Sequence, residues 1–206
     1  MFQCHKQFTN IQFFSKSMPF FHYFCKKFAT MRKLTMPELN RLNVTDYHNV
    51  KKLPVVVVLD NVRSMENVGS FFRTADAFRI EAIYLCGITA RPPHREIHKT
   101  ALGADESVEW KYFETTSQAC EYLKSNNYKI FAVEQVENSI KLNDFKTPEK
   151  SAYIFGNEVD GVDDSVLPYC EQAIEIPQEG TKHSLNVSVS GGIVMYHLFN
   201  DLKKYL

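Results

Sequence analysis

The sequence predicts an α/β fold built on a parallel sheet with helices on both faces. Residues 54–60 (PVVVVLD) form a continuous β-branched run, which is typical of a strand buried on both faces of a parallel sheet. Further apolar runs alternate along the chain with segments of helical spacing, as successive βαβ units require. The chain has 206 residues, 44% of them hydrophobic and 23% charged, which is enough for one sizeable core and marginal for two.

The predicted elements follow in chain order from residue 31. A helix is predicted to begin at Thr35, further helices are predicted over 67–78, 115–127 and 185–206, and strands over 54–60, 80–87, 128–134, 152–156 and 173–177, with a proline-rich loop over 88–97. Thr35 marks the start of the first helix, because Pro37 is tolerated in a first turn. In the third helix Ala119 and Leu123 face inward, with Tyr122 as an open third candidate.

The first 30 residues differ in composition from the rest of the chain. Residues 1–37 contain no Asp or Glu, and residues 1–30 hold four Lys and eight of the 16 Phe. A targeting segment, a membrane-surface arm and a start site assigned upstream of Met31 all fit this pattern. We expect a disordered or mis-assigned basic leader over 1–30 and a functional domain over 31–206.

Charge and cysteine content exclude several classes of protein. Lys plus Arg equals Asp plus Glu at 24 each, so neither a wholly basic nucleic-acid coat nor an acidic disordered chain fits. The longest apolar run, 53–59, is too short to span a membrane. The five cysteines are scattered and contain no CxxC, so we expect no disulfide scaffold, no metal and a reducing, cytoplasmic setting.

Polar residues directly after the strands are the first candidates for chemistry, because ligands of such sheets bind beyond the carboxyl ends of the strands. Asn67 and Gly69 are expected in a strand-to-helix turn, where glycine allows close backbone approach and a helix N-terminus favours an anion. Arg73 points about 140° away from Val68, off an apolar stripe. The stripe consists of Val68, Phe72 and Ala75. The alternative is a surface arginine paired with Asp76 or Glu66.

Two further segments combine glycines with small polar residues. Residues 155–162 (FGNEVDGV) suit a tight ligand-facing loop or a plain connection, and lack the Lys-Ser/Thr ending of a phosphate loop. In residues 176–198, Ser184 or Asn186 can cap the terminal helix. Gly191 and Gly192 inside that helix cost about 1 kcal/mol each, which favours close approach of another backbone or a ligand.

A basic loop precedes these two segments. Residues 91–99, the first nine of the segment 91–105, place Arg91, Arg95, His98 and Lys99 together with His94, opposed there only by Glu96. In a chain that is acidic overall from residue 31 onward, such a loop is a candidate contact with a phosphate backbone. The alternative is an ordinary solvated surface, and the histidines lack companions for a metal site.

Three segments together resemble the signature motifs of the SpoU (TrmH-like) RNA 2′-O-ribose methyltransferases of the SPOUT superfamily. They are NVGSFFRTADAF, FGNEVDGV and IPQEGTKHSLNVSVS, and HKTALGAD resembles the segment between the first two motifs. The resemblance covers about residues 31–206. It implies a parallel-sheet SPOUT fold with a C-terminal deep trefoil knot, bound S-adenosylmethionine, and a homodimer with each active site near the subunit interface. The implied reaction is methyl transfer to a ribose 2′-OH of structured RNA, either tRNA or rRNA.

The resemblance also implies roles for individual residues. It assigns catalytic roles to Arg73, Asn67, Glu158, Ser184 and Asn186. Arginine is effectively always protonated, whereas a general base should titrate near the working pH. We therefore expect Arg73 to position the ribose and stabilise developing negative charge rather than to abstract the proton. Glu158 is expected to order Asn67, Arg73 or the loops around them.

Cofactor contacts are implied around the ends of the later strands. The residues concerned are Val133, Glu134, Gly156, Asn157, Ile176, Pro177, Gln178 and Leu185. Backbone groups and apolar side chains suit the edges and faces of an adenine. Two details depart from the common pattern, since Glu66 replaces a frequent proline and 188–192 (SVSGG) replaces an alanine-rich stretch.

Two other functions and one interface remain open from the sequence. A non-catalytic RNA-binding relative could share the fold, but it would have no reason to keep all five motif residues. An unrelated dinucleotide oxidoreductase is disfavoured because no GxGxxG occurs. For the dimer we expect the terminal helix to contribute through Met195, Leu198, Phe199 and Leu202, with ordinary core packing as the alternative.

Overall fold

The computed structural model describes residues 31–206, and the predicted leader over 1–30 lies outside the described residues. Residues up to Arg41 form a unit separate from the body, Leu42–Leu206. The helix predicted to begin at Thr35 is only a single 3-10 turn, η2 (Pro37–Leu39), with Pro37 in its first turn as expected. The Glu38 carboxylate holds this turn by accepting hydrogen bonds from the Thr35 amide and the Arg32 guanidinium.

The body is built on a seven-stranded sheet in the order β3-β2-β1-β6-β4-β7-β5, and every neighbouring pair is parallel. The strands are β1 (Leu53–Asp60), β2 (Ile80–Cys86), β3 (Glu109–Phe113), β4 (Lys129–Val133), β5 (Ile140–Lys141), β6 (Ser151–Phe155) and β7 (Gln172–Glu175). The central strands β1 and β6 are almost wholly buried, as the β-branched run predicted. All carboxyl ends therefore meet along one edge of the sheet.

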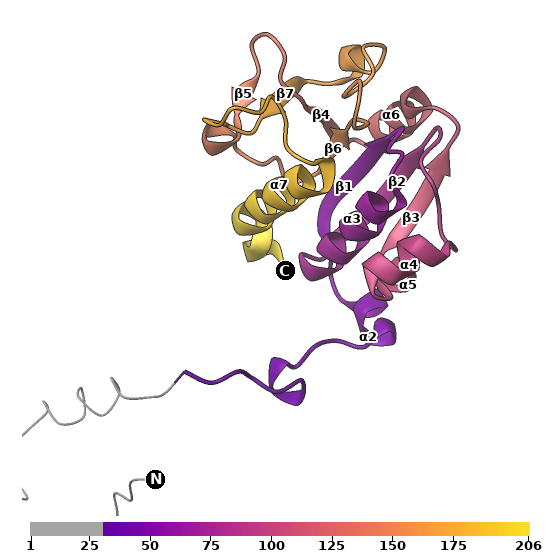
Figure 1. The fold of residues 1–206 in the computed structure, drawn as a ribbon, viewed down its shortest axis with the longest axis vertical. Helices are drawn as coiled ribbons and strands as arrows, with labels where there is room; N and C mark the ends of the chain where they lie inside the picture. Colours follow the sequence, from indigo (N-terminus) through magenta and orange to yellow (C-terminus); the bar gives the residue numbers. More distant parts are fainter. Residues whose placement is uncertain (1–30) are drawn as a thin grey trace, which may run out of the picture. The chain divides into compact units, whose positions relative to one another are not determined.

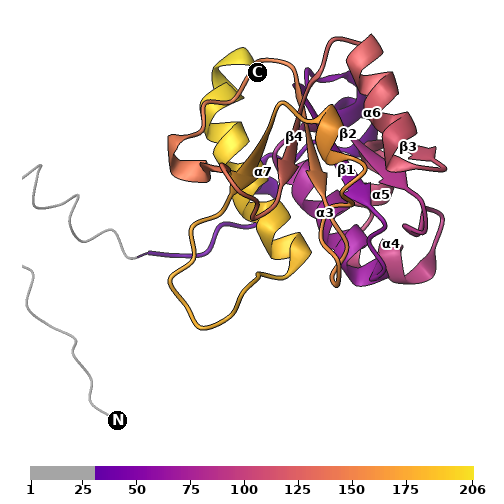
Figure 2. The same ribbon diagram turned by 90° about the horizontal axis from the view of Figure 1, so that it is seen from above.

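Helices cover both faces of this sheet, which gives three layers (Figures 1 and 2). They are α2 (Val44–Asn49), α3 (Met65–Ala77), α4 (Arg95–Ala101), α5 (Ala104–Ser107), α6 (Thr116–Ser125) and α7 (Val187–Leu202). Alternate residues of β1 divide between the layers: Val57 packs with α3 and α7, whereas Val58 packs with α6. The α/β class with a parallel sheet is confirmed.

Close packing of α3 against α7 explains one of the two glycines in the terminal helix. A Cβ on Gly191 would lie 2.2 Å from the Phe71 ring, and Phe71 in turn packs against Phe155 of β6 at 5.1 Å between ring centroids. The expected close approach is therefore real, although a side chain rather than a backbone or ligand makes it. Gly192 faces open space, with nothing within 4 Å of an added Cβ.

The terminal helix buries the side chains that were expected to face a second subunit. Met195, Leu198 and Leu202 are at most 2% exposed and belong to the core of this chain, and Phe199 packs on Phe78. The predicted dimer contacts are therefore wrong for these residues, and core packing is correct. The exposed apolar residues of α7 are on its other face.

Short and irregular elements account for the remaining differences. The predicted loop over 88–97 contains the first turn of α4, and the sequence analysis missed α2, α5, β3 and β5 altogether. Tyr122 does not face inward: it is 38% exposed and lies beside Phe113. No helix within residues 31–206 combines the length and apolar character of a membrane span.

Candidate functional site

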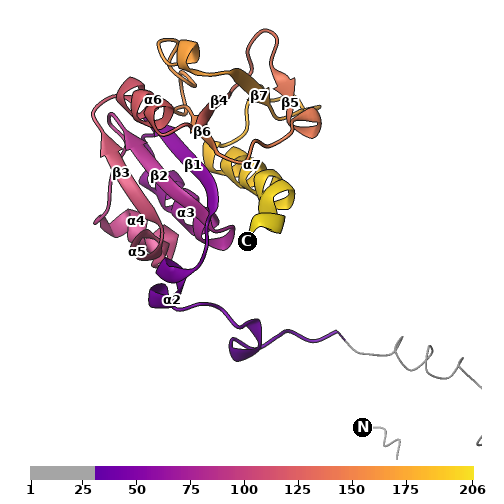
Figure 3. The same ribbon diagram turned by 180° about the vertical axis from the view of Figure 1, so that it is seen from behind.

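A cavity of about 640 Å³ opens at the carboxyl ends of β4, β6 and β7. These three strands lie side by side in the sheet (Figure 3). Val133, Phe155 and Ile174, near the ends of the three strands, form its floor, and the loops that follow them form its walls together with the start of α7. The topology thus brings together segments more than 50 residues apart in the chain.

The residues implied as cofactor contacts converge on this cavity with one exception. Those that line it are Val133, Glu134, Gly156, Asn157, Ile176, Gln178 and Leu185. Pro177 is not among the lining residues, although both of its neighbours are. Three of the implied catalytic residues, Glu158, Ser184 and Asn186, line the cavity as well.

The cavity wall is acidic. Its carboxylates are those of Glu134, Glu158, Asp160, Asp164 and Glu175, and no Lys, Arg or His lines it among the described residues. Carboxylates that face a common cavity favour a ligand that carries positive charge. The apolar side chains on the floor and walls suit a flat, uncharged ring system.

The loop 156–161 closes on itself and depends on two glycines. Asn157 and Gly161 exchange backbone hydrogen bonds of 3.0 and 3.2 Å, and the Asn157 side chain accepts from the amides of Val159 and Asp160 at 2.9 Å. Gly161 has φ +73°, and a Cβ on Gly156 would lie 1.9 Å from the Gly161 carbonyl carbon. Only glycine therefore fits at position 156, which matches the expectation of a tight loop.

Glu134 supports this loop from the end of β4. Its Oε2 accepts from the Val162 amide at 3.1 Å, and its Oε1 accepts from the Gln135 amide at 2.8 Å. A Cβ on Gly161 would lie 2.3 Å from Oε2, so the carboxylate occupies the space beside that glycine. The side chain thus shapes the cavity wall in addition to lining it.

A chain of side-chain hydrogen bonds connects three loops at the rim of the cavity. Asn186 Nδ2 donates to Asn67 Oδ1 at 3.1 Å, and Asn67 Nδ2 donates to Glu158 Oε1 at 2.8 Å. The Glu158 carboxylate also accepts from the amides of Arg63 and Ser64 at 3.1 and 3.2 Å. Glu158 thus contacts Asn67 and the segment that leads into α3, whereas Arg73 is not part of this chain of contacts.

The Glu158 carboxyl is poised to remain ionised. Partial burial raises its pKa, but the hydrogen bonds from Asn67 and from the amides of Arg63 and Ser64 outweigh this effect, so its pKa lies below the ordinary value. An ionised acceptor strengthens each of these hydrogen bonds. Glu158 therefore acts as an anionic clamp between the loop after β6 and the start of α3.

Asn186 has a second role at the start of α7. Its Oδ1 accepts from the amides of Ser188 and Val189 at 2.9 and 3.2 Å, which caps the helix as predicted. With the oxygen used for the cap, the amide nitrogen is directed at Asn67. Ser184 is exposed at the cavity, in a segment held by the hydrogen bond from Gln135 Nε2 to the His183 carbonyl at 3.2 Å.

Arg73 lies away from the cavity of its own chain. It is exposed on α3, six residues after Asn67, which is about 9 Å along the helix and about 240° around it. It makes no ion pair or side-chain hydrogen bond within residues 31–206. The alternative pairing is wrong, because Asp76 accepts from Ser107 at 2.9 Å and Glu66 from Ser64 at 3.0 Å.

Asn67 and Gly69 lie inside α3 rather than in the turn that was expected to hold them. The helix begins at Met65, and Ser64 caps it by accepting from the Asn67 amide at 3.2 Å. A Cβ on Gly69 would lie 2.6 Å from the Ile97 carbonyl oxygen, so this glycine makes room for α4 and not for a ligand.

The predicted RNA contacts gather at the other side of the body, beside β3. Arg91 stacks on Tyr112, with its guanidinium carbon 4.2 Å from the ring centroid. Arg95 and Lys99 are exposed on α4, and His98 Nδ1 lies 3.1 Å from the Asp105 carboxylate. None of these side chains lines the acidic cavity.

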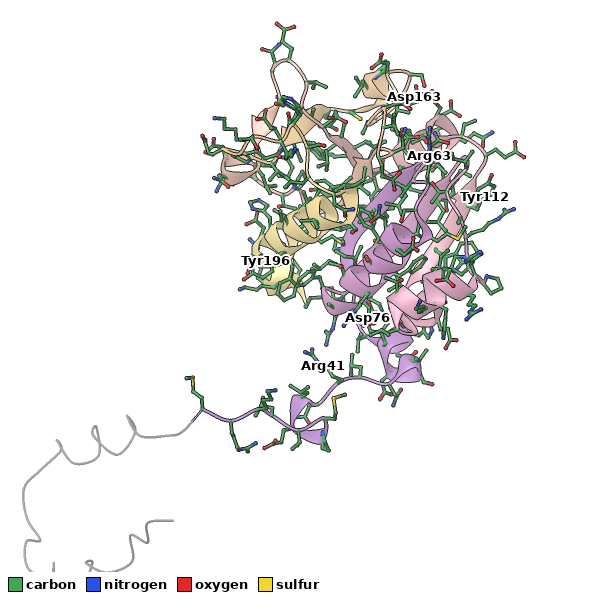
Figure 4. All side chains as sticks on the ribbon, viewed as in Figure 1. Arg41, Arg63, Asp76, Tyr112, Asp163 and Tyr196 are labelled. Atoms are coloured by element: carbon green, nitrogen blue, oxygen red, sulfur yellow. The ribbon has the colours of Figure 1, made fainter. Side chains whose placement is uncertain are left out.

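Sequence reasoning missed the residues that tie the loops together. The Arg63 guanidinium lies 3.7 Å from Asp160, and buried Asp60 accepts from Thr116 and from the Asp163 amide. Figure 4 shows Arg63 and Asp163 toward the end of the sheet where β1 finishes, and Asp76 at the far end of α3. The charge of Asp60 directly after a buried apolar run was a signal that could have identified it.

Comparison with known proteins decides the family. A family model described as the SpoU rRNA Methylase family matches residues 54–196. The chain belongs to the SpoU rRNA methylase family. The matched segment of this SpoU chain includes Asn67, Arg73, Glu158 and Asn186, together with the carboxyl ends of β4, β6 and β7.

Relatives of this SpoU chain are named as RNA methyltransferases. A 23S rRNA (guanosine-2′-O-)-methyltransferase RlmB of Neisseria meningitidis is 29% identical over 158 residues, which are 76% of this chain and 62% of that protein. A tRNA (guanosine(18)-2′-O)-methyltransferase of Borreliella burgdorferi is 25% identical over 179 residues, 87% and 81% of the two chains. The chain spans about 60% of the length of the N. meningitidis relative and of a Staphylococcus saprophyticus protein named as a TrmH family methyltransferase.

Solved structures share the fold of this SpoU chain. The A. aeolicus TrmH/SpoU tRNA modifying enzyme aligns with a TM-score of 0.70 at 22% identity, over 79% of this chain and 83% of that one. AviRb from Streptomyces viridochromogenes, a SpoU methyltransferase solved in complex with the cofactor AdoMet, aligns with a TM-score of 0.67 at 19% identity, over 75% and 60%.

Proposed function

We propose that this protein is an S-adenosylmethionine-dependent methyltransferase that acts on a ribose 2′-hydroxyl of structured RNA, of the tRNA or rRNA class. The observation that carries the proposal is the acidic cavity, bordered by the linked side chains of Glu158, Asn67 and Asn186, in a chain of the SpoU family. The names of the relatives, which specify 2′-O-methylation of rRNA or tRNA, support the substrate class.

The residues around the cavity fit S-adenosylmethionine. Its sulfonium and ammonium groups are positive, and the cavity wall presents five carboxylates. Its adenine is flat and uncharged, and Val133, Ile176 and Leu185 offer apolar surface beside the backbone of the loop 156–161. When bound there, the cofactor supplies a methyl group that the sulfonium already activates.

The chain's own residues supply position and electrostatics. The Glu158 clamp and Asn67 hold the start of α3 against the cavity rim, while Asn186 fixes the start of α7. Ser184 at the rim offers a hydroxyl toward the ribose. Holding the ribose hydroxyl at the methyl donor is the main catalytic requirement, since no strong acid or base is needed to activate that donor. The proton that the hydroxyl loses on methyl transfer would pass to solvent water.

Arg73 completes the site from a second copy of the chain. It is exposed, free of carboxylate partners in the described part of the chain, and turned away from the cavity of its own subunit. In this arrangement the guanidinium positions the ribose and stabilises negative charge on its oxygen, because a group that stays protonated cannot abstract a proton.

The exposed face of α7 supports a homodimer. Val189, Ile193 and Tyr196 are 51%, 39% and 57% exposed and follow one another at four- and three-residue spacing. They form an apolar stripe on the helix face opposite the core, and Figure 4 shows Tyr196 at the outside of α7. Light scattering of the full chain at micromolar concentration should give a dimer, and Tyr196→Asp should give a monomer.

The strand order supports a trefoil knot in the C-terminal part. β7 is inserted between the earlier strands β4 and β5, and the chain then returns past the loop 156–161 to pack α7 against α3. Single-molecule unfolding can test it. If a knotted chain is pulled between residues 42 and 206, its final length should fall short of the fully extended length, which is about 3.5 Å per residue. A final length equal to the fully extended length would contradict the knot.

The decisive experiment combines binding and transfer on the full chain. Calorimetry should detect binding of S-adenosylmethionine and S-adenosylhomocysteine, and labelled methyl should pass from the cofactor to tRNA or rRNA at a ribose 2′-oxygen. Absence of binding to both compounds would overturn the proposal. Tight RNA binding without transfer to any RNA would instead identify a non-catalytic RNA-binding relative. Residues 31–206 alone should match the full chain in both assays if they hold the functional domain.

A further inference from the structure

A second pocket lies at the opposite side of the body from the candidate active site. It has a volume of about 500 Å³ and is walled by Pro92, Pro93, His94, Arg95, His98 and Trp110. Trp110 belongs to β3, the edge strand of the sheet, and the prolines and Arg95 come from the loop and first turn that lead into α4. This hollow is the β3 pocket.

The aromatic wall of the β3 pocket is extended by its neighbours. Trp110 and Tyr112 are two residues apart on β3, so they lie on the same face of the sheet, and both pack only partly against the core. The Arg91 guanidinium stacks on the Tyr112 ring, and the Tyr112 hydroxyl donates to the Gly87 carbonyl at 3.1 Å. One face of the edge strand β3 therefore carries the Trp110 ring and, two residues on, the stacked pair of Arg91 and Tyr112.

Cationic and polar groups border the β3 pocket. The Arg95 side chain is 92% exposed, and its nearest carboxylate, that of Glu96, lies 3.9 Å away. The Asp105 carboxylate, 6% exposed, holds His98 by Nδ1 at 3.1 Å, so Nε2 is the ring nitrogen available to a ligand. The Asp105 and Glu106 side chains also line the pocket, which gives it acceptors as well as donors.

We propose that the β3 pocket binds an unpaired nucleobase of the RNA, stacked on Trp110, at a position other than the nucleotide that is methylated. This inference rests on the proposed function. Proteins recognise unpaired bases by stacking them on aromatic rings or arginine planes and by hydrogen bonds to their edges, and the β3 pocket presents both. Phosphate contacts alone would need the cations but not the aromatic wall.

The position of the β3 pocket sets which part of the RNA it reaches. β3 lies three strand spacings from β6, which is about 14 Å across the sheet. The base in the β3 pocket therefore belongs to a different nucleotide from the one in the active site. Arg91, Arg95 and Lys99 lie around the pocket and can hold the backbone of the RNA on either side of that base.

The chain offers a direct optical probe of this pocket. Trp110 is the single tryptophan of the sequence, so all tryptophan emission of the full chain reports on it. Titration with an eight-nucleotide oligoadenylate should quench the emission saturably, because a base stacks on the indole. Heparin, a polyanion without bases, should bind without this quenching. Equal quenching by heparin and oligoadenylate would overturn the proposal.

Substitutions separate stacking from charge. Trp110→Leu should weaken binding of fluorescein-labelled oligoadenylate by about tenfold or more, measured by anisotropy, whereas Trp110→Phe should change it by less than about threefold. Arg95→Gln should lower the slope of log affinity against log salt concentration by about one, which corresponds to the loss of one phosphate contact. Lys141→Gln, an exposed lysine on the opposite edge strand β5, is the matched control and should change neither quantity.

The outcomes distinguish this inference from the proposed function. Each variant should bind S-adenosylhomocysteine like the wild type, which shows that the fold is intact. If Trp110→Leu binds oligoadenylate and methylates RNA with unchanged KM, the pocket proposal fails while the methyltransferase proposal stands. If binding depends on Trp110 but no RNA accepts methyl groups, the methyltransferase proposal fails and the base pocket stands.

Discussion

The cavity at β4, β6 and β7 and the β3 pocket differ in almost every physical respect. Five carboxylates and no cation line the cavity within the described structure, whereas the β3 pocket combines Arg95 and two histidines with the two carboxylates of Asp105 and Glu106. Loops that are fastened to one another by polar side chains form the cavity. The β3 pocket is formed by a helix start and an edge strand, with a tryptophan as its wall.

This difference follows from the charges of the two proposed ligands. A sulfonium donor is positive and RNA is strongly negative, so a surface that attracts one repels the other. Placing the two sets of charges at different positions along the sheet lets one chain hold both. The side chain proposed to meet the reacting ribose, Arg73, lies on α3 and lines neither pocket of its own chain.

The largest expected effect is the loss of cofactor binding at the cavity, while base binding in the β3 pocket is retained. Gly156→Ala places a Cβ 1.9 Å from the Gly161 backbone, so the loop 156–161 cannot keep its shape. We expect calorimetry to show loss of S-adenosylhomocysteine binding, while oligoadenylate still quenches Trp110. Gly180→Ala, with open space around the added Cβ, is the control and should bind normally. Normal cofactor binding by Gly156→Ala would contradict this account of the loop.

The next effect concerns Arg73, which lines neither pocket. Arg73→Ala should reduce methyl transfer by about 100-fold or more, the usual loss when a group that stabilises transition-state charge is removed. Binding of S-adenosylhomocysteine and of oligoadenylate should both be unchanged, because the side chain lines neither pocket. The exposed cation Lys51, changed to Ala, provides the control. A loss of cofactor binding equal to the loss of transfer would refute this assignment.

A matched pair of glycines tests how α7 reaches the cavity. Gly191→Ala drives a Cβ into the Phe71 ring, and overpacking of this kind costs about 1–3 kcal/mol of unfolding free energy. Gly192→Ala meets nothing within 4 Å and should gain up to about 1 kcal/mol of helix stability. Urea unfolding measures both. Because Ser190 of α7 lines the cavity, Gly191→Ala should also weaken cofactor binding. Equal changes in unfolding free energy for the two variants would contradict the packing of Gly191 against Phe71.

The smallest expected effect is the pH dependence of the Glu158 clamp. Its pKa is lowered in the folded protein, so its stabilising contribution is complete above the ordinary carboxyl pKa of about 4.3 and is lost as the pH falls through the lower folded value. The difference in unfolding free energy between wild type and Glu158→Gln should therefore shrink below pH 4. A difference that stays constant from pH 7 to pH 3.5 would show that the carboxylate does not act as a clamp.

Much of the fold was predictable because its signals are local. The β-branched run of β1, the apolar stripe of Val68, Phe72 and Ala75, and the Asn186 cap each depend on a few adjacent residues. The short elements α5, β3 and β5 were missed because four, five and two residues show too little periodicity. Met195, Leu198 and Leu202 of α7, which were expected to face a second subunit, belong to the core, and the sequence did not separate the two faces because the helix is apolar nearly all round.

By itself the sequence determined the parallel α/β class, the order of the longer strands and helices and the family, because these follow from local patterns and from ordered motifs. Only the tertiary structure decided that Glu158 binds the amides of Arg63 and Ser64, more than 90 residues away, and that Arg73 lies outside the cavity of its own chain. Such contacts depend on how the crossover connections of the sheet place each loop. A hydrogen bond between residues so far apart in the chain produces no local sequence pattern from which it could be predicted.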